Sequence, residues 1–146
     1  MQSFNVFAIQ PFNVFALQPL NIGQEFAKVY YNRMMVSGVN GTIDLFNPNV
    51  ICTIDSEELV GSYNWLLKMT KAGIARFEYQ NISGSYQPLI SNQMCGNDYL
   101  IVVNGNLRAV NLWGYLISDW MRFNETFILG KYGDNYVIRN YILSTK

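Results

Sequence analysis

The C-terminal segment from Trp120 to Leu143 constrains the fold most strongly, because it contains two apolar stretches joined by a turn. From Met121 to Leu129 apolar and polar residues alternate with the period of two that a strand requires. The stretch from Tyr136 to Leu143 is rich in β-branched and aromatic residues. Gly133 and Asp134 between them favour a tight reversal. The segment therefore predicts an antiparallel hairpin within a larger curved sheet, which helices from earlier in the chain must cover.

Length and charge limit the number of domains and the kinds of partner. The chain has 146 residues, of which 50% are hydrophobic, and this is enough for one core and one folded domain. Ten Lys and Arg residues balance ten Asp and Glu residues. No net field therefore favours nucleic acid or an anionic membrane, and we expect neither as a direct partner.

The sequence contains no histidine and two cysteines, Cys52 and Cys95, which lack metal-ligand spacing. This composition excludes the usual zinc sites and His-based catalytic triads, so we expect no metal and no cofactor. The N-terminus lacks the basic region of a signal peptide, and no apolar run approaches the length of a membrane span. We expect an intracellular protein of the cytoplasm or the nuclear envelope that is not secreted.

Residues 3–18 contain an internal repeat with a period of eight residues, SFNVFAIQ followed by PFNVFALQ. Two units are too few for a solenoid, so we expect residues 1–20 to form a tail and residues 21–146 to form the domain. The tail is either a duplication without a role or a tandem peptide ligand that competes for a Phe-binding groove. The anchors of such a ligand are Phe4, Phe7, Phe12 and Phe15.

Helical spacing and capping residues predict three helices in the first half of the chain. The first begins near Asn21, whose side chain can cap the free amides, and ends at Ser37-Gly38. The others span about 41–46 and 62–71, the second of these after the acidic turn DSEE. Strands are predicted at 50–54, at 75–82 with a continuation past Gly84 to Ile90 as an alternative, at 98–103 and at 106–110, followed by the terminal hairpin. This order predicts an α+β fold with helices on one side of a bent antiparallel sheet.

Five ordered segments between Asn21 and Leu143 resemble the nuclear transport factor two-like family: IGQEFAKVYYNRMM, DLFNPNVICTID, LVGSYNWLLK, RFNETFIL and NYVIRNYIL. The patterns EFxxxYY and RFxxTFxL are especially similar to the N-terminal domain of stress-granule Ras-GAP-binding proteins. The resemblance implies a cone-shaped, cystatin-like α+β roll, a strongly curved antiparallel sheet packed on three N-terminal helices. It also implies a homodimer through the outer face of the sheet, for which the candidates are Tyr79, Trp120, Arg122 and Tyr141.

The resemblance implies a non-enzymatic interaction domain that binds Phe-containing peptides, either Phe-x-x-Phe motifs or nucleoporin-like segments. The apolar lining of the implied groove consists of Ile22, Phe26, Phe46 and Ile142, residues that would also serve as core. The alternative is a small-molecule binder or an enzyme of the isomerase or cyclase type that uses the interior of the cone. Tyr30 matches a phenol of such isomerases, but the position of their catalytic aspartate is Ile54, so we expect no catalytic residue.

Two further stretches are candidate partner surfaces. Asp55, which is next to Glu57 and Glu58, resembles one position of the acidic rim by which the transport factor binds the Ran GTPase. The acidic pair expected after Leu107 is replaced by Val110, Asn111 and Leu112, so the resemblance does not extend to Ran binding. The apolar stretch 110–117 either lengthens two strands and packs inward or, if Trp113 is exposed, forms a second partner surface.

Overall fold

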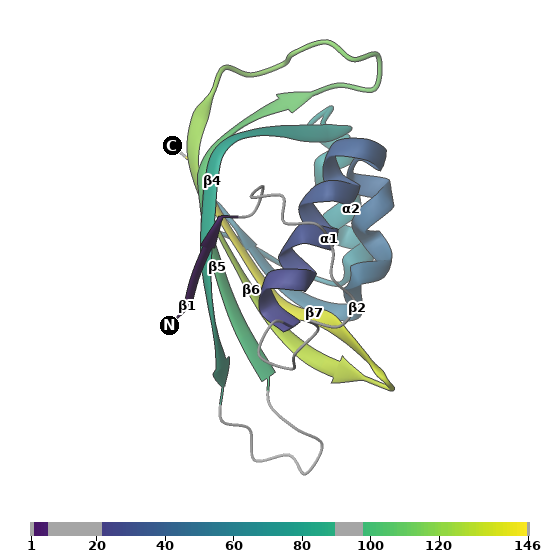
Figure 1. Ribbon diagram of the computed structural model, residues 1–146. Coiled ribbons are helices and arrows are strands. Elements are labelled where there is room, and N and C mark those ends of the chain that lie inside the picture. Colours follow the sequence, from purple (N-terminus) through teal and green to yellow (C-terminus); the bar gives the residue numbers. More distant parts are fainter. Residues whose placement is uncertain (1, 6–21, 90–97, 146) are drawn as a thin grey trace.

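The computed structural model describes residues 2–5, 22–89 and 98–145 of the chain. It has the predicted α+β composition, with the helices in the first half of the chain and the long strands in the second (Figure 1). The elements, in order, are β1 (Gln2–Asn5), α1 (Ile22–Ser37), the 3-10 helix η3 (Val39–Leu45), β2 (Phe46–Ile54), β3 (Glu57–Val60), α2 (Ser62–Lys71), β4 (Arg76–Leu89), β5 (Asp98–Val110), β6 (Met121–Tyr132) and β7 (Asn135–Thr145).

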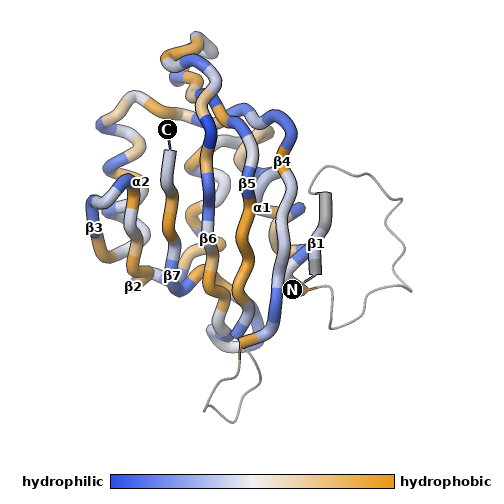
Figure 2. The backbone as a smooth tube through the Cα atoms, turned by 90° about the vertical axis from the view of Figure 1, so that its left-hand side faces the viewer, coloured by the Kyte–Doolittle hydropathy of each residue, from blue (hydrophilic) through white to orange (hydrophobic). Residues whose placement is uncertain are grey.

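The strands form one curved sheet in the order β1-β4-β5-β6-β7-β2-β3. All neighbouring pairs are antiparallel except β2 and β7, which run parallel. Figure 1 shows α1 and α2 on one side of the sheet, and Figure 2 looks onto the opposite side. We call the helix-covered side the inner face and the other side the outer face. None of the helices in the described ranges is long and apolar enough to cross a membrane.

Helix α1 lies on the inner face through a stripe of buried residues that includes Phe26, Tyr30 and Met34. Their spacing of four residues places them on one side of a helix, as the sequence indicates. Gly38 ends the helix with a φ of 75°. A Cβ atom at this position would lie 2.3 Å from the carbonyl oxygen of Ala75, so only glycine fits here.

Aromatic rings occupy the space between the helices and the inner face. The ring of Phe46 lies 4.4 Å from that of Trp65 on α2, and the ring of Tyr30 lies 4.8 Å from that of Phe127 on β6, measured between centroids. All four side chains are buried. Packing of this kind joins α1, α2 and the long strands into one core.

The terminal hairpin forms as predicted, and the reversal is as tight as the sequence indicates. Strands β6 and β7 pair along their length up to Tyr132 and Asn135, which leaves Gly133 and Asp134 as the turn. Gly133 has a φ of 66°, the conformation that favours glycine.

Strand β2 begins earlier than predicted, β4 follows the longer of its two predicted ranges, and three further differences concern β5, β3 and β1. Strand β5 is continuous where a break was predicted near Gly105, because β4 and β6 pair with both of its sides. Asp55 and Ser56 adopt positive φ and form a tight turn, so Glu57 to Val60 folds back as β3. Residues 2–5, predicted as part of the tail, pair with β4 as the edge strand β1.

Candidate functional site

A buried carboxyl group lies inside the cone at Glu125 on β6. Its side chain accepts hydrogen bonds from the hydroxyls of Tyr31 on α1, at 2.6 Å, and of Tyr141 on β7. Burial raises the pKa of Glu125 from 4.5 to about 7, although the hydroxyls of Tyr141, Tyr31 and Tyr30 act in the opposite direction. The hydroxyl of Tyr79 is also buried and has no hydrogen-bond partner among the described residues.

An apolar pocket of about 300 Å³ opens between α2 and the strands at the other end of the core. The polar groups on its edge are engaged in structural contacts. Asp55 accepts hydrogen bonds from the backbone amide and the hydroxyl of Thr145, and Lys68 pairs with Glu57. Glu125 is not part of the lining. The apolar lining residues are Ile54, Met69, Ala72, Ile74, Phe77, Leu107, Ala109, Ile117, Met121 and Leu143.

The segment joining β5 to β6, residues 111–120, exposes large apolar side chains beside this pocket, and we call it the aromatic loop. Leu112 is 79% exposed, Trp113 77% and Tyr115 70%. Leu116, Ile117 and Trp120 are also exposed, and Ile117 lines the pocket as well. The stretch therefore does not pack inward, and the exposure of Trp113 that the second interpretation requires is present.

Hydrogen bonds within the aromatic loop hold its shape. The side-chain oxygen of Asn111 accepts from the backbone amides of Trp113, at 3.0 Å, and of Tyr115, at 2.9 Å. Gly114 supplies the positive φ of the reversal, at 84°. The Ile117 amide donates to the carbonyl of Ala109 on β5. The exposed side chains are therefore presented on a preformed loop, which lowers the entropic cost of binding.

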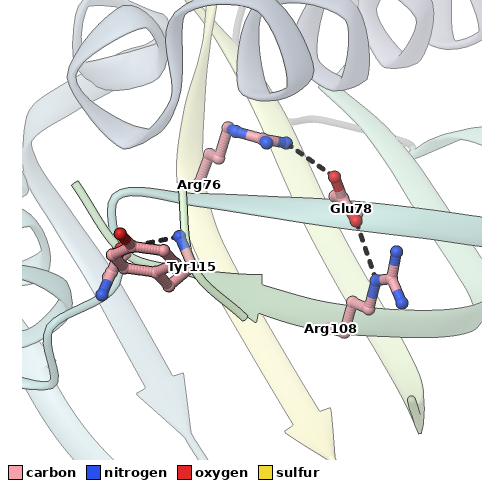
Figure 3. Close-up of polar contacts among 5 residues, drawn as sticks. Arg76, Glu78, Arg108 and Tyr115 are labelled. Atoms are coloured by element: carbon pink, nitrogen blue, oxygen red, sulfur yellow. Dashed lines mark hydrogen bonds and ion pairs between the residues drawn. The ribbon is translucent and has the colours of Figure 1, made fainter. Parts of the chain in front are cut away.

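An ion-pair network lies on the strands next to the aromatic loop. Glu78 on β4 accepts from Arg76 and from Arg108 on β5, as Figure 3 shows together with Tyr115 of the loop. Both arginines lower the pKa of Glu78, and the hydrogen bond from Arg108 has the larger effect. Arg108 also stacks on the ring of Trp120, with its guanidinium carbon 4.4 Å from the ring centroid. The base of the loop is thus tied to two strands.

The structure does not bring the four predicted groove residues together. Phe26 and Phe46 are buried in the core, and Ile22 is partly buried against the core. Ile142 is 43% exposed and lies on the outer face of the sheet, because its neighbours Tyr141 and Leu143 point inward. Its assignment to a groove with Phe26 and Phe46 is therefore wrong.

The predicted dimer-face residues divide between the two faces. Trp120 and Arg122 are exposed, whereas Tyr141 is fully buried with its hydroxyl on Glu125. Tyr79 also points inward, with its ring 4.9 Å from that of Tyr31 on α1. Tyr79 and Tyr141 are thus corrected to the inner face, an error of one residue in strand phase.

The outer face nevertheless carries an apolar row across neighbouring strands. Val102 on β5 pairs with Thr126 on β6, and Thr126 pairs with Ile142 on β7. Ile51 on β2 and Val60 on β3 extend the apolar surface toward the other edge and are themselves exposed. None of the helices in the described part of the chain covers this face (Figure 2).

The remaining predicted residues lie at the pocket edge or in the tail. Asp55 lines the pocket, Glu57 pairs with Lys68, and Glu58 is exposed on β3. Phe4 belongs to β1, opposite Gly84 of β4. The other three tail anchors, Phe7, Phe12 and Phe15, lie outside the described residues.

Sequence reasoning missed Glu125, although a signal was present. The alternation along β6 puts position 125 on the same face as Phe123 and Phe127. A charged residue at such a position indicates a buried, hydrogen-bonded carboxyl group. The identity of its phenol partners depends on the packing of α1 and β7 against β6, which strand periodicity does not contain.

No protein-family model and no curated protein matches this sequence, but solved structures match the fold. Nuclear transport factor 2 from Cryptosporidium parvum has a TM-score of 0.67 and 19% identity, covering 86% of this chain and 93% of that chain. A structure of the yeast deubiquitinase Ubp3 and Bre5 cofactor complex has a TM-score of 0.62 and 15% identity, with coverages of 89% and 98%. A putative ketosteroid isomerase from Parabacteroides distasonis has a TM-score of 0.57 and 14% identity, with coverages of 86% and 89%. The chain therefore has the nuclear transport factor 2-like fold.

Proposed function

We propose that this chain is a non-enzymatic protein-binding domain that receives Phe-containing segments of partner proteins. The observation that carries the proposal is the aromatic loop, which holds large apolar side chains in solvent beside an apolar pocket. A shallow apolar site with aromatic neighbours takes a phenylalanine side chain well. The proposed receptor is this pocket and not the groove predicted around Phe26, because that side chain belongs to the core.

The position of the carboxyl group inside the cone supports a non-enzymatic function. Glu125 has the raised pKa expected of a general acid or base, but it is 1% exposed and lies outside the lining of the pocket. A general base must reach the proton that it removes, directly or through one water molecule. The fold itself is compatible with both classes, since the similar structures include a putative isomerase and a complex of Bre5 with a deubiquitinase.

The binding test is titration of a synthetic Phe-x-x-Phe peptide into the full-length protein. Ala72→Trp fills the pocket from an exposed position on its edge and should weaken peptide binding at least tenfold. Val36→Trp, at an exposed position of α1, is the matched control and should leave the affinity unchanged. Equal affinity of native protein and Ala72→Trp would exclude the pocket as the receptor.

We also propose that the domain forms a homodimer through the outer face, supported by the exposed Ile51, Val60 and Ile142 and by the lack of a covering helix among the described residues. Sedimentation at micromolar concentration should give twice the chain mass. Ile142→Lys places a charge in the middle of the row and should produce a monomer, whereas the control Val36→Lys on α1 should remain dimeric. A native monomer at this concentration would refute the interface.

A further inference from the structure

The edge of β4 that faces away from β5 pairs with β1, the strand nearest the N-terminus of the chain. Strand β1 pairs antiparallel with β4 in a defined register, with Gln2 opposite Tyr86 and Asn5 opposite Ser83. An edge strand has a row of backbone N–H and C=O groups that are available to any extended segment. The described ladder therefore identifies this part of β4 as an edge that accepts an added strand.

The sequence contains a second copy of the strand that occupies this edge. The eight-residue period aligns Gln10-Pro11-Phe12-Asn13 with Gln2-Ser3-Phe4-Asn5. In the observed register Phe4 stands opposite Gly84, and Phe12 is the residue of the second copy that aligns with Phe4. An aromatic residue paired with a strand glycine is a favourable cross-strand arrangement. Three of the four residues that define the ladder are thus identical in both copies.

We propose that the edge of β4 from Ser83 to Tyr86 is a strand-addition site for this four-residue unit, and that residues 10–13 occupy it in alternation with residues 2–5 of the same chain. The repeat then provides two interchangeable strands for one edge. Exchange moves the chain by eight residues and releases the first unit into solvent. This site is separate from the pocket and does not depend on Phe-peptide binding there.

The chain between the second unit and α1 is long enough for this exchange. Helix α1 begins at Ile22, and Gly23 packs so closely on Tyr86 that a Cβ atom there would lie 2.7 Å from the Tyr86 Cβ. With Asn13 opposite Ser83, eight residues lie between Asn13 and Ile22, and the nine residue-to-residue steps span up to about 30 Å when extended. The distance along β4 from Ser83 to Tyr86 is about 10 Å.

Pro11 makes the second unit the weaker occupant. It would stand opposite Ser85, where Ser3 is found in β1. Proline has no backbone N–H, and edge strands tolerate it where the missing group points away from the neighbouring strand. The second unit thus forms at most one hydrogen bond fewer than the first. We expect the first unit to predominate and the second to replace it when the first is removed.

Disulfide trapping tests the proposal in the full chain. All variants carry Cys95→Ser and keep Cys52. The Cys52 thiol is buried, and burial raises its pKa to about 12, so it is unreactive. Ser83→Cys is combined with Asn5→Cys for the first unit or with Asn13→Cys for the second, which leaves Pro11 in place. Ile9→Cys with Ser83→Cys is the control, because position 9 is four residues from both reporter positions.

In a glutathione redox buffer at low protein concentration, the Asn5 pair should form the disulfide most readily. The Asn13 pair should have an equilibrium constant at least tenfold above that of the Ile9 pair, and deletion of residues 2–9 should raise it further. An Asn13 pair equal to the Ile9 control would overturn the proposal, as would an unchanged value after the deletion. Disulfides formed mainly between chains would overturn the exchange within one chain.

Discussion

The carboxyl group of Glu125 on β6 accepts a 2.6 Å hydrogen bond from the hydroxyl of Tyr31 on α1, and both side chains are fully buried. Removing a carboxylate from water is costly unless hydrogen bonds replace its hydration. Tyr141 on β7 provides the second donor, so one acidic group links a helix to two adjacent strands. The raised pKa of Glu125 shows that these donors offset only part of the cost of burial.

Stability should therefore depend on pH through Glu125. Because its pKa is raised from 4.5 to about 7, the stability that the protonated group contributes is fully present below pH 4.5 and is lost as the pH rises through 7. Glu125→Gln does not titrate. The free energy of unfolding of this variant, measured against native protein by urea denaturation, should gain about 3 kcal/mol between pH 4.5 and pH 8.

The control for this series is Glu58→Gln, which removes an exposed carboxyl on β3. This variant makes the same substitution on the surface and measures the effect of replacing a carboxyl by an amide outside the core. A pH-independent difference between Glu125→Gln and native protein would mean that Glu125 titrates alike in the folded and unfolded states.

Removal of one phenol donor should raise the pKa of Glu125 further. The Tyr31 hydroxyl stabilises the charged carboxylate, so Tyr31→Phe removes an interaction that lowers the pKa. We expect a cost of about 1–3 kcal/mol above pH 7, where the carboxylate is charged, and a smaller cost at pH 5. Carbon-13 NMR of the Glu125 carboxyl measures the pKa directly, and an unchanged midpoint would contradict the assigned role of Tyr31.

The elements that the sequence predicts well are those whose pattern is set locally. The spacing of Phe26, Tyr30 and Met34 defines α1, and the turn at Gly133 and Asp134 defines the terminal hairpin. The sequence predicts two strands in place of β5, because the Asn-Gly-Asn stretch at 104–106 resembles a turn. Pairing with strands on both sides overrides that local preference, and such pairing is a property of the sheet.

The candidate site was less predictable, because faces of a strand depend on register. Tyr141 and Ile142 are adjacent, yet the Tyr141 hydroxyl donates a hydrogen bond to Glu125 inside the cone, whereas the Ile142 side chain is exposed to solvent. A register error of one residue exchanges these environments. The exposure of Trp113 was similarly undecided by sequence, since an apolar run fits a buried strand as well as a loop held by Asn111.

Truncation of Phe46 tests whether this side chain belongs to the core or to a surface groove. This side chain is buried against Trp65 and Tyr141, with centroid distances of 4.4 and 5.6 Å. Phe46→Ala should reduce the free energy of unfolding by about 3–5 kcal/mol, whereas Trp113→Ala in the aromatic loop should change it by less than about 1 kcal/mol. Urea denaturation of both variants checks this, and a small loss for Phe46→Ala would restore a surface role for that residue.

Asp55 should stabilise the fold by joining the turn after β2 to the end of β7. Its two carboxylate oxygens accept from the backbone amide of Thr145 at 2.7 Å and from the Thr145 hydroxyl at 2.6 Å. Asp55 also adopts a φ of 45°, which aspartate and asparagine tolerate better than alanine. Asp55→Ala should cost about 2–3 kcal/mol through loss of both bonds and through backbone strain.

Asp55→Asn is the informative partner of that variant, because it keeps the tolerance of positive φ and one carbonyl acceptor. We expect it to cost about 1 kcal/mol and to retain slow hydrogen exchange at the Thr145 amide. In Asp55→Ala the same amide should exchange faster, since its acceptor is gone. Equal stability loss in the two variants, together with equal exchange at Thr145, would show that the carboxylate does not hold the end of β7.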